Sequence, residues 1–516
     1  MSFASRGSAA RPRPRLLAFA LAATVAAAAC ALNQEGVPPP KNEIYYPGGA
    51  LVDSTGDWLY VANSNSDLRY NDGTLVVVDL ASAGDDYQKP STPWPACSSL
   101  QYVAPTYAPP VRGDSTTHHC CWDVLDPETL NCDSRNYVDP DATVRIGSFA
   151  AAMVFNPRTT CHGKTTPLPC IGQLLVSARG NTSITEIDTE IDPAVGADNR
   201  RFFCSDDRAP FAECAANYRV TERVPVKGVD PPPPNDANKI ILPEEPYALA
   251  MNGTDDVTDM TKTKTQLLVG HLRGGAISLV DISQPTPTLI GYYGALVPAD
   301  SNGLRGITSL LRHGGQFFAG SRYVPRVMGV VTTGQDNGMT AEVLDNIAIV
   351  DSGEQYVSSL PGSETRGIQF VPPVSPTDPF AGEEAFVLQR VPPALLRFEV
   401  NNPLNQAPVD VIETCNSPTF IDHHGTGVTF RLYVTCFEDG EVYVFDPHVP
   451  RLVDIIEVGR GPAGLAFPPS GSKYEDKYVY VVGFGANNIS VVDIEAGSPT
   501  ENHVVQRIGY PSPVPR

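Results

Sequence analysis

Two short hydrophobic patterns alternate along the chain, and each predicts a β-strand. The first is an apolar run such as LYVAN at 59–63, and the second is an apolar run that ends in an acid, such as LVVVD at 75–79. Both runs are rich in β-branched and aromatic residues, and turn residues separate them, as is typical of strands. The pair occurs seven times. The acids that end the second runs are Asp79, Asp188, Asp281, Asp351, Glu399, Asp446 and Asp493.

The spacing of these pairs predicts a repeat architecture. The last four of the acids are 48, 47 and 47 residues apart. A period near 47 suits a propeller blade of four strands. A further apolar run precedes each pair and another often follows it, so each unit has strands A, B, C and D in chain order. The sequence therefore predicts an all-β fold, a seven-bladed β-propeller of four-stranded antiparallel blades with disulfide-containing loop insertions in the first two blades.

The first three intervals between the acids are longer, which indicates inserted segments. The segment after the first acid separates strands C and D of blade 1, so that 142–146 is a delayed fourth strand. In blade 4, the run at 347–351 is interpreted as strand C, and the long B–C loop before it, which contains GQDNGM, as a lid. The predicted insertions are 81–142, 156–171, 189–215 and 322–344.

At this point the chain resembles a known family of propellers. LYVAN, LYVTC at 432–436 and VYVVG at 479–483, with a VVD after the last, resemble the YVTN-type, YncE-like propellers and the related lactonase-type seven-bladed propellers. The resemblance is best over about 417–510 and looser before residue 345. It implies the seven-bladed fold, and it leaves the function open because one fold serves many functions.

The beginning of the chain has the composition of a secretory signal. Four arginines and no acid occur in 1–15, an apolar run of 14 residues follows at 16–29, and Cys30 comes next. The run is too short to span a bilayer, which needs about 20 residues. Ala27-Ala28-Ala29-Cys30 resembles a bacterial lipobox, although leucine is usual where Ala27 stands, so ordinary cleavage nearby is the alternative. We expect a signal peptide at 1–29, a tether at 30–43 lipidated on Cys30, and a single propeller at 44–516.

The lipobox resemblance also implies a location. Ala31 stands where an aspartate tends to retain such lipoproteins in the inner membrane. We therefore expect an exported protein that is lipid-anchored to the bacterial outer membrane, with the side of that membrane left open.

The cysteines agree with export. There are 11, and if Cys30 carries lipid an even number remains, which suggests disulfides in an exported protein. Cys415 precedes strand A of blade 6 and Cys436 ends strand B, so antiparallel pairing brings the two together and predicts a bond. The other predicted bonds, which close local loops, are Cys161–Cys170 and Cys204–Cys214. The sequence leaves open the connectivity of Cys97, Cys120, Cys121 and Cys132.

Charge suggests where a ligand would bind. The formal charge is −21, and −25 without the four signal arginines, which argues against a nucleic-acid partner. Against this background, seven arginines follow strand B or precede strand A, positions that share one face of the ring, here named the top face. Guanidinium groups suit carboxylates and phosphates, but they also pair with local acids, and the sequence leaves both readings open. This arginine rim consists of Arg179, Arg273, Arg305, Arg322, Arg366, Arg390 and Arg460.

No motif in the sequence identifies a reaction. There is no GxSxG, HExxH, P-loop or CxxC pattern, and neither a cofactor nor a metal is expected. Asp422-His423-His424 spells a phosphoesterase motif outside its usual context, so we interpret it as structural, as we do the repeated acids and the lone His271. The prediction is a non-enzymatic binding or scaffold module. Its expected partners are the membrane, through Cys30, and an unknown protein, glycan or small anionic ligand. The alternative is a lactonase-like hydrolase with its site at the channel mouth.

Overall fold

The structure is a computed structural model, and it describes most of the chain after the expected signal. The described residues are 36–88, 94–97, 120–162, 168–192, 199–224, 239–251, 265–294, 297–313, 316–333, 346–349, 356–357, 363–374, 382–400 and 408–509.

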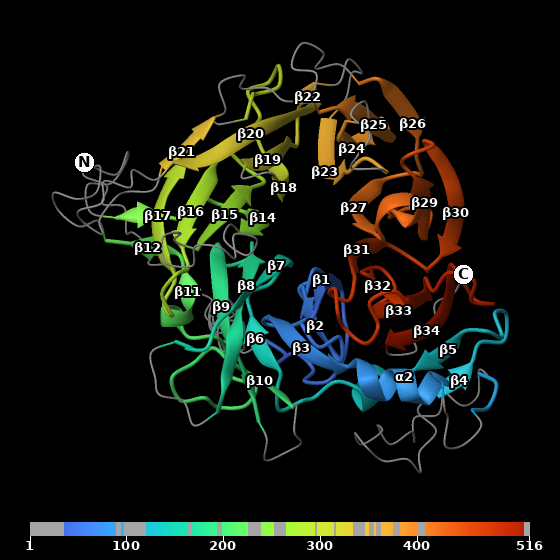
Figure 1. The fold of residues 1–516 in the computed structure, drawn as a ribbon. Helices are drawn as coiled ribbons and strands as arrows, with labels where there is room; N and C mark the ends of the chain where they lie inside the picture. The colour runs from blue at the N-terminus through green and yellow to red at the C-terminus, as the bar shows by residue number, and fades with distance from the viewer. Residues whose placement is uncertain are drawn as a thin grey trace, which may run out of the picture.

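Seven sheets surround a common axis, and the chain passes through them in order from β1 to β34 (Figure 1). Blade 1 consists of β1 (Pro47–Val52), β2 (Trp58–Asn63), β3 (Gly73–Asp79) and β6 (Val144–Ile146). Blade 2 consists of β7 (Ala150–Pro157), β8 (Cys170–Ala178), β9 (Ser183–Ile191), β10 (Arg200–Phe203) and β11 (Arg219–Val220). Blade 3 consists of β14 (Pro246–Met251), β15 (Gln266–His271), β16 (Ile277–Asp281) and β17 (Thr288–Tyr293). Blade 4 consists of β18 (Ile307–His313), β19 (Gln316–Ser321), β20 (Arg326–Thr333), β21 (Asn346–Ile349) and β22 (Tyr356–Val357).

The last three blades each contribute four strands of their own. Blade 5 consists of β23 (Ser363–Val371), β24 (Glu384–Val391), β25 (Ala394–Glu399) and β26 (Asp410–Glu413). Blade 6 consists of β27 (Pro418–His424), β28 (Arg431–Cys436), β29 (Glu441–Asp446) and β30 (Arg451–Glu457). Blade 7 consists of β31 (Pro462–Ala466), β32 (Tyr478–Gly483), β33 (Asn488–Asp493) and β34 (His503–Gly509).

The predicted fold is therefore confirmed: this is a seven-bladed β-propeller of antiparallel blades, with disulfides in the inserted loops. The inner strands contact one another in a closed cycle, from β1 through β7, β14, β18, β23 and β27 to β31 and back to β1. The hydrophobic cores lie between neighbouring blades, and each is built from residues of two adjacent sheets. Among the described residues, no helix combines the length and apolar character that a bilayer crossing requires.

Blade 4 corrects one prediction. Its third strand is β20, and the run at 346–349 is the fourth strand, paired with the second half of β20. The expected 322–344 loop therefore contains a strand, and GQDNGM lies outside the described residues. The reason is that β20 is an apolar run without a closing acid, whereas the next run has one. Hydrophobic pattern locates strands, but it does not decide which neighbour each strand pairs with.

The ring is closed by an insertion from blade 1. The hairpin of β4 (Cys120–Trp122) and β5 (Leu130–Cys132) leaves blade 1 and pairs with blade 7, where β5 runs parallel to β34. The helix α2 (Leu80–Gln88) lies beside the same joint, and its Ala83 carbonyl accepts a hydrogen bond from Gln506 Nε2 at 3.1 Å. The hairpin thus connects the first and last blades. The remaining short elements are β12 (Glu222–Arg223), β13 (Ile240–Ile241), η1 (Ser134–Asn136), η2 (Ala216–Tyr218) and η3 (Gly427–Thr429).

Ten cysteines form five disulfides. The structure contains the three bonds that the sequence predicts, Cys161–Cys170, Cys204–Cys214 and Cys415–Cys436. It also settles the connectivity that the sequence left open, as Cys97–Cys121 and Cys120–Cys132. The second of these bonds joins the two strands of the closing hairpin. Cys30 lies outside the described residues.

The second half of the expected tether lies against blade 1. The backbone carbonyls of Glu43 and Lys41 accept hydrogen bonds from Asn63 Nδ2 at 3.0 Å and Thr143 Oγ1 at 2.7 Å. The backbone N–H of Asn71 donates to the carbonyl of Val37 at 3.1 Å. The part of the tether that the structure describes is therefore attached to the propeller.

Candidate functional site: the central channel and its arginine rim

The inner strands enclose a cavity of about 340 Å³ on the axis of the propeller. All seven blades line it, and most of the lining residues are glycine, alanine or larger aliphatic residues. This volume lies at the lower end of the range for small-molecule pockets, roughly 300–1,000 Å³. Of the described residues that line the cavity, only Arg366 and Asp422 are charged.

A bulge near the start of every inner strand shapes the upper end of the channel. The register of each A–B pair shifts once, within the first residues of the inner strand. In six blades a residue with a left-handed backbone lies next to this bulge. In five of them it directly precedes the first paired residue of the inner strand, and in blade 5 it directly precedes the register shift. These residues are Tyr46, Phe149, Glu245, Glu364, Ser417 and Gly461. Bulges redirect side chains, and in these six blades the left-handed residue lies at the end of the inner strand that is nearer the top face.

In blade 5 this position holds Glu364, which three arginines of the rim share. Its φ is 63°, and its N–H donates to the backbone carbonyl of Arg322 in blade 4 at 2.7 Å. Arg366 Nη2 donates to Glu364 Oε2 at 2.8 Å, and Arg390 Nη1 donates to the same oxygen at 3.3 Å. Arg322 Nε lies 3.9 Å from Glu364 Oε1. We name Glu364, Arg322, Arg366 and Arg390 the Glu364 cluster.

The Glu364 cluster carries a local excess of positive charge. Three guanidiniums surround one carboxylate, and no second acid contacts them among the described residues. Their side chains are 13–33% exposed, so water reaches them only in part. Partly desolvated cations with a single counter-ion attract a further anion more strongly than exposed cations do.

The other four arginines of the rim are spread around the ring. Arg273 is 73% exposed and donates to Glu244 Oε2 at 2.8 Å. Arg179 lies over the rings of Phe149 and Tyr247, with its guanidinium carbon 5.5 and 5.8 Å from the ring centroids. Arg305 is half-buried, and Arg460 is exposed. The structure thus concentrates three of the seven predicted residues and disperses the rest, and only Arg366 lines the cavity.

The lower end of the channel holds a second polar group. Gln369 Nε2 donates to the backbone carbonyl of Ile421 at 3.3 Å and to Asp422 Oδ1 at 3.4 Å. Gln369 Oε1 can only accept, so His423 Nδ1 carries the proton in their 3.0 Å hydrogen bond. The His423 ring stacks on Phe430, with centroids 4.8 Å apart. Burial raises the pKa of Asp422 to about 6 and lowers the pKa of His423.

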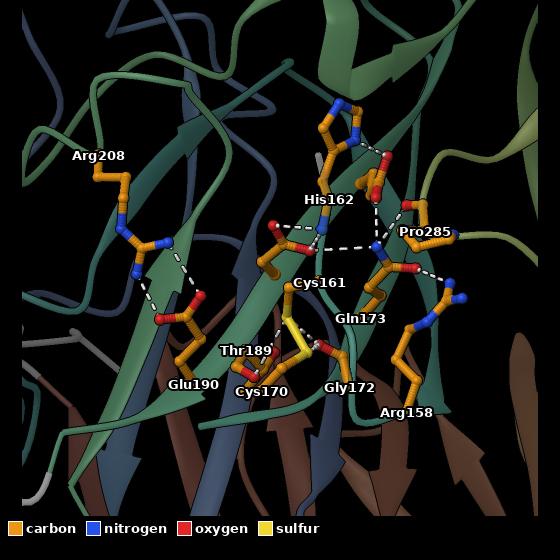
Figure 2. Close-up of a disulfide and its surroundings, with 12 residues drawn as sticks. Arg158, Cys161, His162, Cys170, Gly172, Gln173, Thr189, Glu190, Arg208 and Pro285 are labelled. Atoms are coloured by element: carbon orange, nitrogen blue, oxygen red, sulfur yellow. Dashed lines mark hydrogen bonds and ion pairs between the residues drawn. A yellow bond between two sulfur atoms is a disulfide. The ribbon is translucent and has the colours of Figure 1, made fainter. Parts of the chain in front are cut away.

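A separate cluster of ionisable side chains lies in blade 2, beside a disulfide. His162 follows Cys161, which is bonded to Cys170 (Figure 2). The His162 backbone N–H donates to both carboxylate oxygens of Asp188 at 3.1 Å, and its Nδ1 lies 3.1 Å from Glu186 Oε2.

Gln173 completes this cluster (Figure 2). Its Nε2 donates to Glu186 Oε1, to Asp188 Oδ1 and to the Pro285 carbonyl. Its Oε1 accepts a hydrogen bond from Arg158. Glu186 and Asp188 are each 1% exposed, and burial raises the pKa of Glu186 to about 7. Because the carboxylates are covered, we assign this cluster a structural role.

The sequence did not identify Glu364, Gln369 or Asp422 as members of a site. Glu364 stands two residues before a predicted arginine, in SETRG, so its proximity was a usable signal. Asp422 was interpreted as structural because its motif lacked a familiar context, although its inner strand was located correctly. Among the described residues, no group of three or more His, Cys, Asp or Glu side chains is arranged to hold a metal.

Comparison with known proteins adds no family. No protein-family model and no curated protein matches the chain. Solved structures with a similar arrangement include the periplasmic gluconolactonase PpgL of Pseudomonas aeruginosa, at 12% identity and a TM-score of 0.42 over 65% of this chain and 82% of that one. Apo AztD of Citrobacter koseri matches at 13% identity and a TM-score of 0.38, over 81% and 88%. The hydrazine synthase of Kuenenia stuttgartiensis matches at 10% and 0.37, over 90% and 98%. Likeness this distant carries no argument about function.

Proposed function

We propose that this chain is an exported binding protein whose propeller recognises a small anionic ligand at the top of its central channel. One observation carries the proposal: in the Glu364 cluster, three half-buried guanidiniums share one carboxylate beside a cavity of ligand size. An incoming carboxylate or phosphate would supply the missing counter-charge through charge-assisted hydrogen bonds. The YVTN-like patterns and the lipobox-like sequence before Cys30 support the proposal that this binding role belongs to an anchored propeller of the lactonase type.

Anion binding should depend on the arginines that do not line the cavity as well as on Arg366. Octanoate, titrated into the mature protein by calorimetry, is the probe. Changing Arg322 and Arg390 together to glutamine should raise its Kd at least tenfold, about 1.4 kcal/mol, because Arg366 then remains as the sole cation of the cluster and is already paired with Glu364. In the wild type, affinity should fall as salt rises.

Arg273→Gln is the matched control, since Arg273 lies on the same face but is exposed and paired with Glu244. Glu364→Gln should strengthen octanoate binding, because it frees all three guanidiniums. If neither the double variant nor Glu364→Gln changes the Kd for octanoate, the proposal is refuted. Lactone hydrolysis by the mature protein would instead favour the lactonase-like alternative, in which Asp422 is the carboxylate placed to act as a base.

The anchoring part of the proposal rests on Cys30. Cys30→Ser should move the protein from the membrane fraction to the soluble periplasmic fraction, or stall its processing, because no acyl chain can be attached. Fractionation and intact-mass measurement of both forms test this. Unchanged mass and unchanged membrane association would contradict lipidation at this residue.

A further inference from the structure

We propose that the central channel binds an elongated molecule with an anionic group at one end, a protonated amine at the other and an apolar middle. The inference rests on the proposed function, because the Glu364 cluster holds the anionic end. It adds Asp422 as the group that binds the amine, and so specifies the class of ligand.

The two charges that line the channel lie at opposite ends of it. The inner strands β23 and β27 have their bulges at the same place, so Gln369 and Asp422 occupy equivalent positions, each two residues beyond the bulge. Arg366 lies within the bulge of β23, three residues nearer the top face than Gln369. At roughly 3.3 Å per residue, the backbone levels of Arg366 and Asp422 are about 10 Å apart along the strands.

The wall between these two charges is apolar. Leu249, Leu310, Ile368, Ile421 and Leu465 line the cavity together with glycines and alanines. A chain of methylene groups would replace water against such a wall favourably, whereas a charge at that level would be left without a partner.

Two of the threonine hydroxyl groups along this wall are already engaged. Thr308 Oγ1 donates to the backbone carbonyl of Thr365, and Thr419 Oγ1 donates to the carbonyl of Pro462 at 3.0 Å. These bonds join neighbouring blades, so the two hydroxyl protons are committed to the ring and do not face a ligand. Ser309, which also lines the cavity, has a hydroxyl oxygen without a hydrogen-bond partner among the described residues, but that atom is covered. The charged groups open to a ligand are therefore at the two ends.

Asp422 has an oxygen free to accept a hydrogen bond. Its Oδ1 accepts from the His423 backbone N–H at 2.8 Å and from Gln369 Nε2, whereas Oδ2 has no partner among the described residues. The side chain is 32% exposed, so the channel reaches it. An ammonium group would pair with this carboxylate by a charge-assisted hydrogen bond.

The test compares three probes by calorimetry on the mature protein: ω-aminooctanoate, octanoate and octylamine. We expect the Kd of ω-aminooctanoate to be at least ten times lower than that of octanoate. Asp422→Asn, which preserves side-chain volume, should abolish this gain without weakening octanoate binding, because it removes a negative charge from the channel. Asp476→Asn is the control, because Asp476 is 83% exposed and bonded to His424 at the end of the same strand, outside the cavity lining.

The outcomes separate the two proposals. Octanoate binding that depends on Arg322 and Arg390 without any gain from the amine would overturn this inference and leave the proposed function standing. Failure of octanoate to bind at all would overturn the proposed function and, with it, this extension. A gain that persists in Asp422→Asn would also overturn the inference. If that variant does not fold, competition decides it in the wild type, where octylamine should displace ω-aminooctanoate; no displacement would refute the amine site.

Discussion

Replacing Cys120 and Cys132 together by serine should lower the free energy of unfolding by more than about 3 kcal/mol. A disulfide that closes a loop of this length, with a sequence separation of 12, stabilises by about 3 kcal/mol through the entropy of the unfolded chain. We expect a loss larger than this loop-entropy value because the bond joins β4 to β5, and β5 is the strand that pairs with β34.

The closing interface explains why the excess should be large. Blade 1 contains the beginning of the described chain and blade 7 its end. The backbone therefore does not run directly from one of these two blades into the other, as it does between the other neighbours. A single core cluster there combines Leu59 and Val76 of blade 1, Val482 of blade 7, and Leu130 and Tyr137 of the insertion. Without the disulfide, strands of only three residues must hold their register unaided, and the packing at the joint loosens.

Cys204→Ser with Cys214→Ser is the matched control. This disulfide has a sequence separation of 10, so loop entropy predicts nearly the same loss. It lies in the core between blades 1 and 2, where the Cys214 N–H donates to the Arg145 carbonyl at 3.0 Å, so it does not join the first and last blades. Denaturant unfolding of both double variants gives the comparison. Equal losses of unfolding free energy in the two double variants would show that the Cys120–Cys132 disulfide stabilises only its own loop and not the joint between blades 1 and 7.

The blade 2 cluster should make a large contribution to the pH dependence of stability, and Glu186→Gln should make the protein more stable at pH 8. Burial raises the pKa of Glu186 to about 7 from an ordinary value of 4.5. The native state therefore holds a proton that the unfolded chain releases, so this stabilisation is present at acidic pH and is lost as pH rises through about 7. The shift corresponds to up to about 3 kcal/mol between pH 4.5 and pH 8.

Its neighbours act in the same direction. The pKa of Asp188 is raised by burial, so Asp188 also favours the native state at acidic pH. The pKa of His162 is raised by its hydrogen bond to Glu186, so His162 and Glu186 titrate as one pair and their contributions are not counted separately. Between pH 5 and pH 8, the Tm of Glu186→Gln should fall by less than the Tm of the wild type. The exposed Glu457→Gln should follow the wild type. A Glu186→Gln variant that is less stable than the wild type at pH 8 would show that the ionised carboxylate is needed there.

The sequence by itself determined the repeated unit. Short β-branched runs and a period near 47 residues are local properties, and they sufficed to predict the seven blades and the delayed strand β6. The same locality explains the pairing of Cys161, Cys204 and Cys415 with the cysteines that follow them, since each pair closes one loop or one hairpin.

Only the tertiary structure decided what crosses from one blade to another. The pairing of β5 with β34, the sharing of Glu364 by Arg322, Arg366 and Arg390, and the position of Asp422 in the channel all join segments from different parts of the ring. Hydrophobic alternation tells which face of a strand is buried, but it carries no information about which side chain lies opposite. That is set by the bulges and by the closing of the ring, and therefore the arginine rim was predicted as seven equivalent residues although only three share a carboxylate.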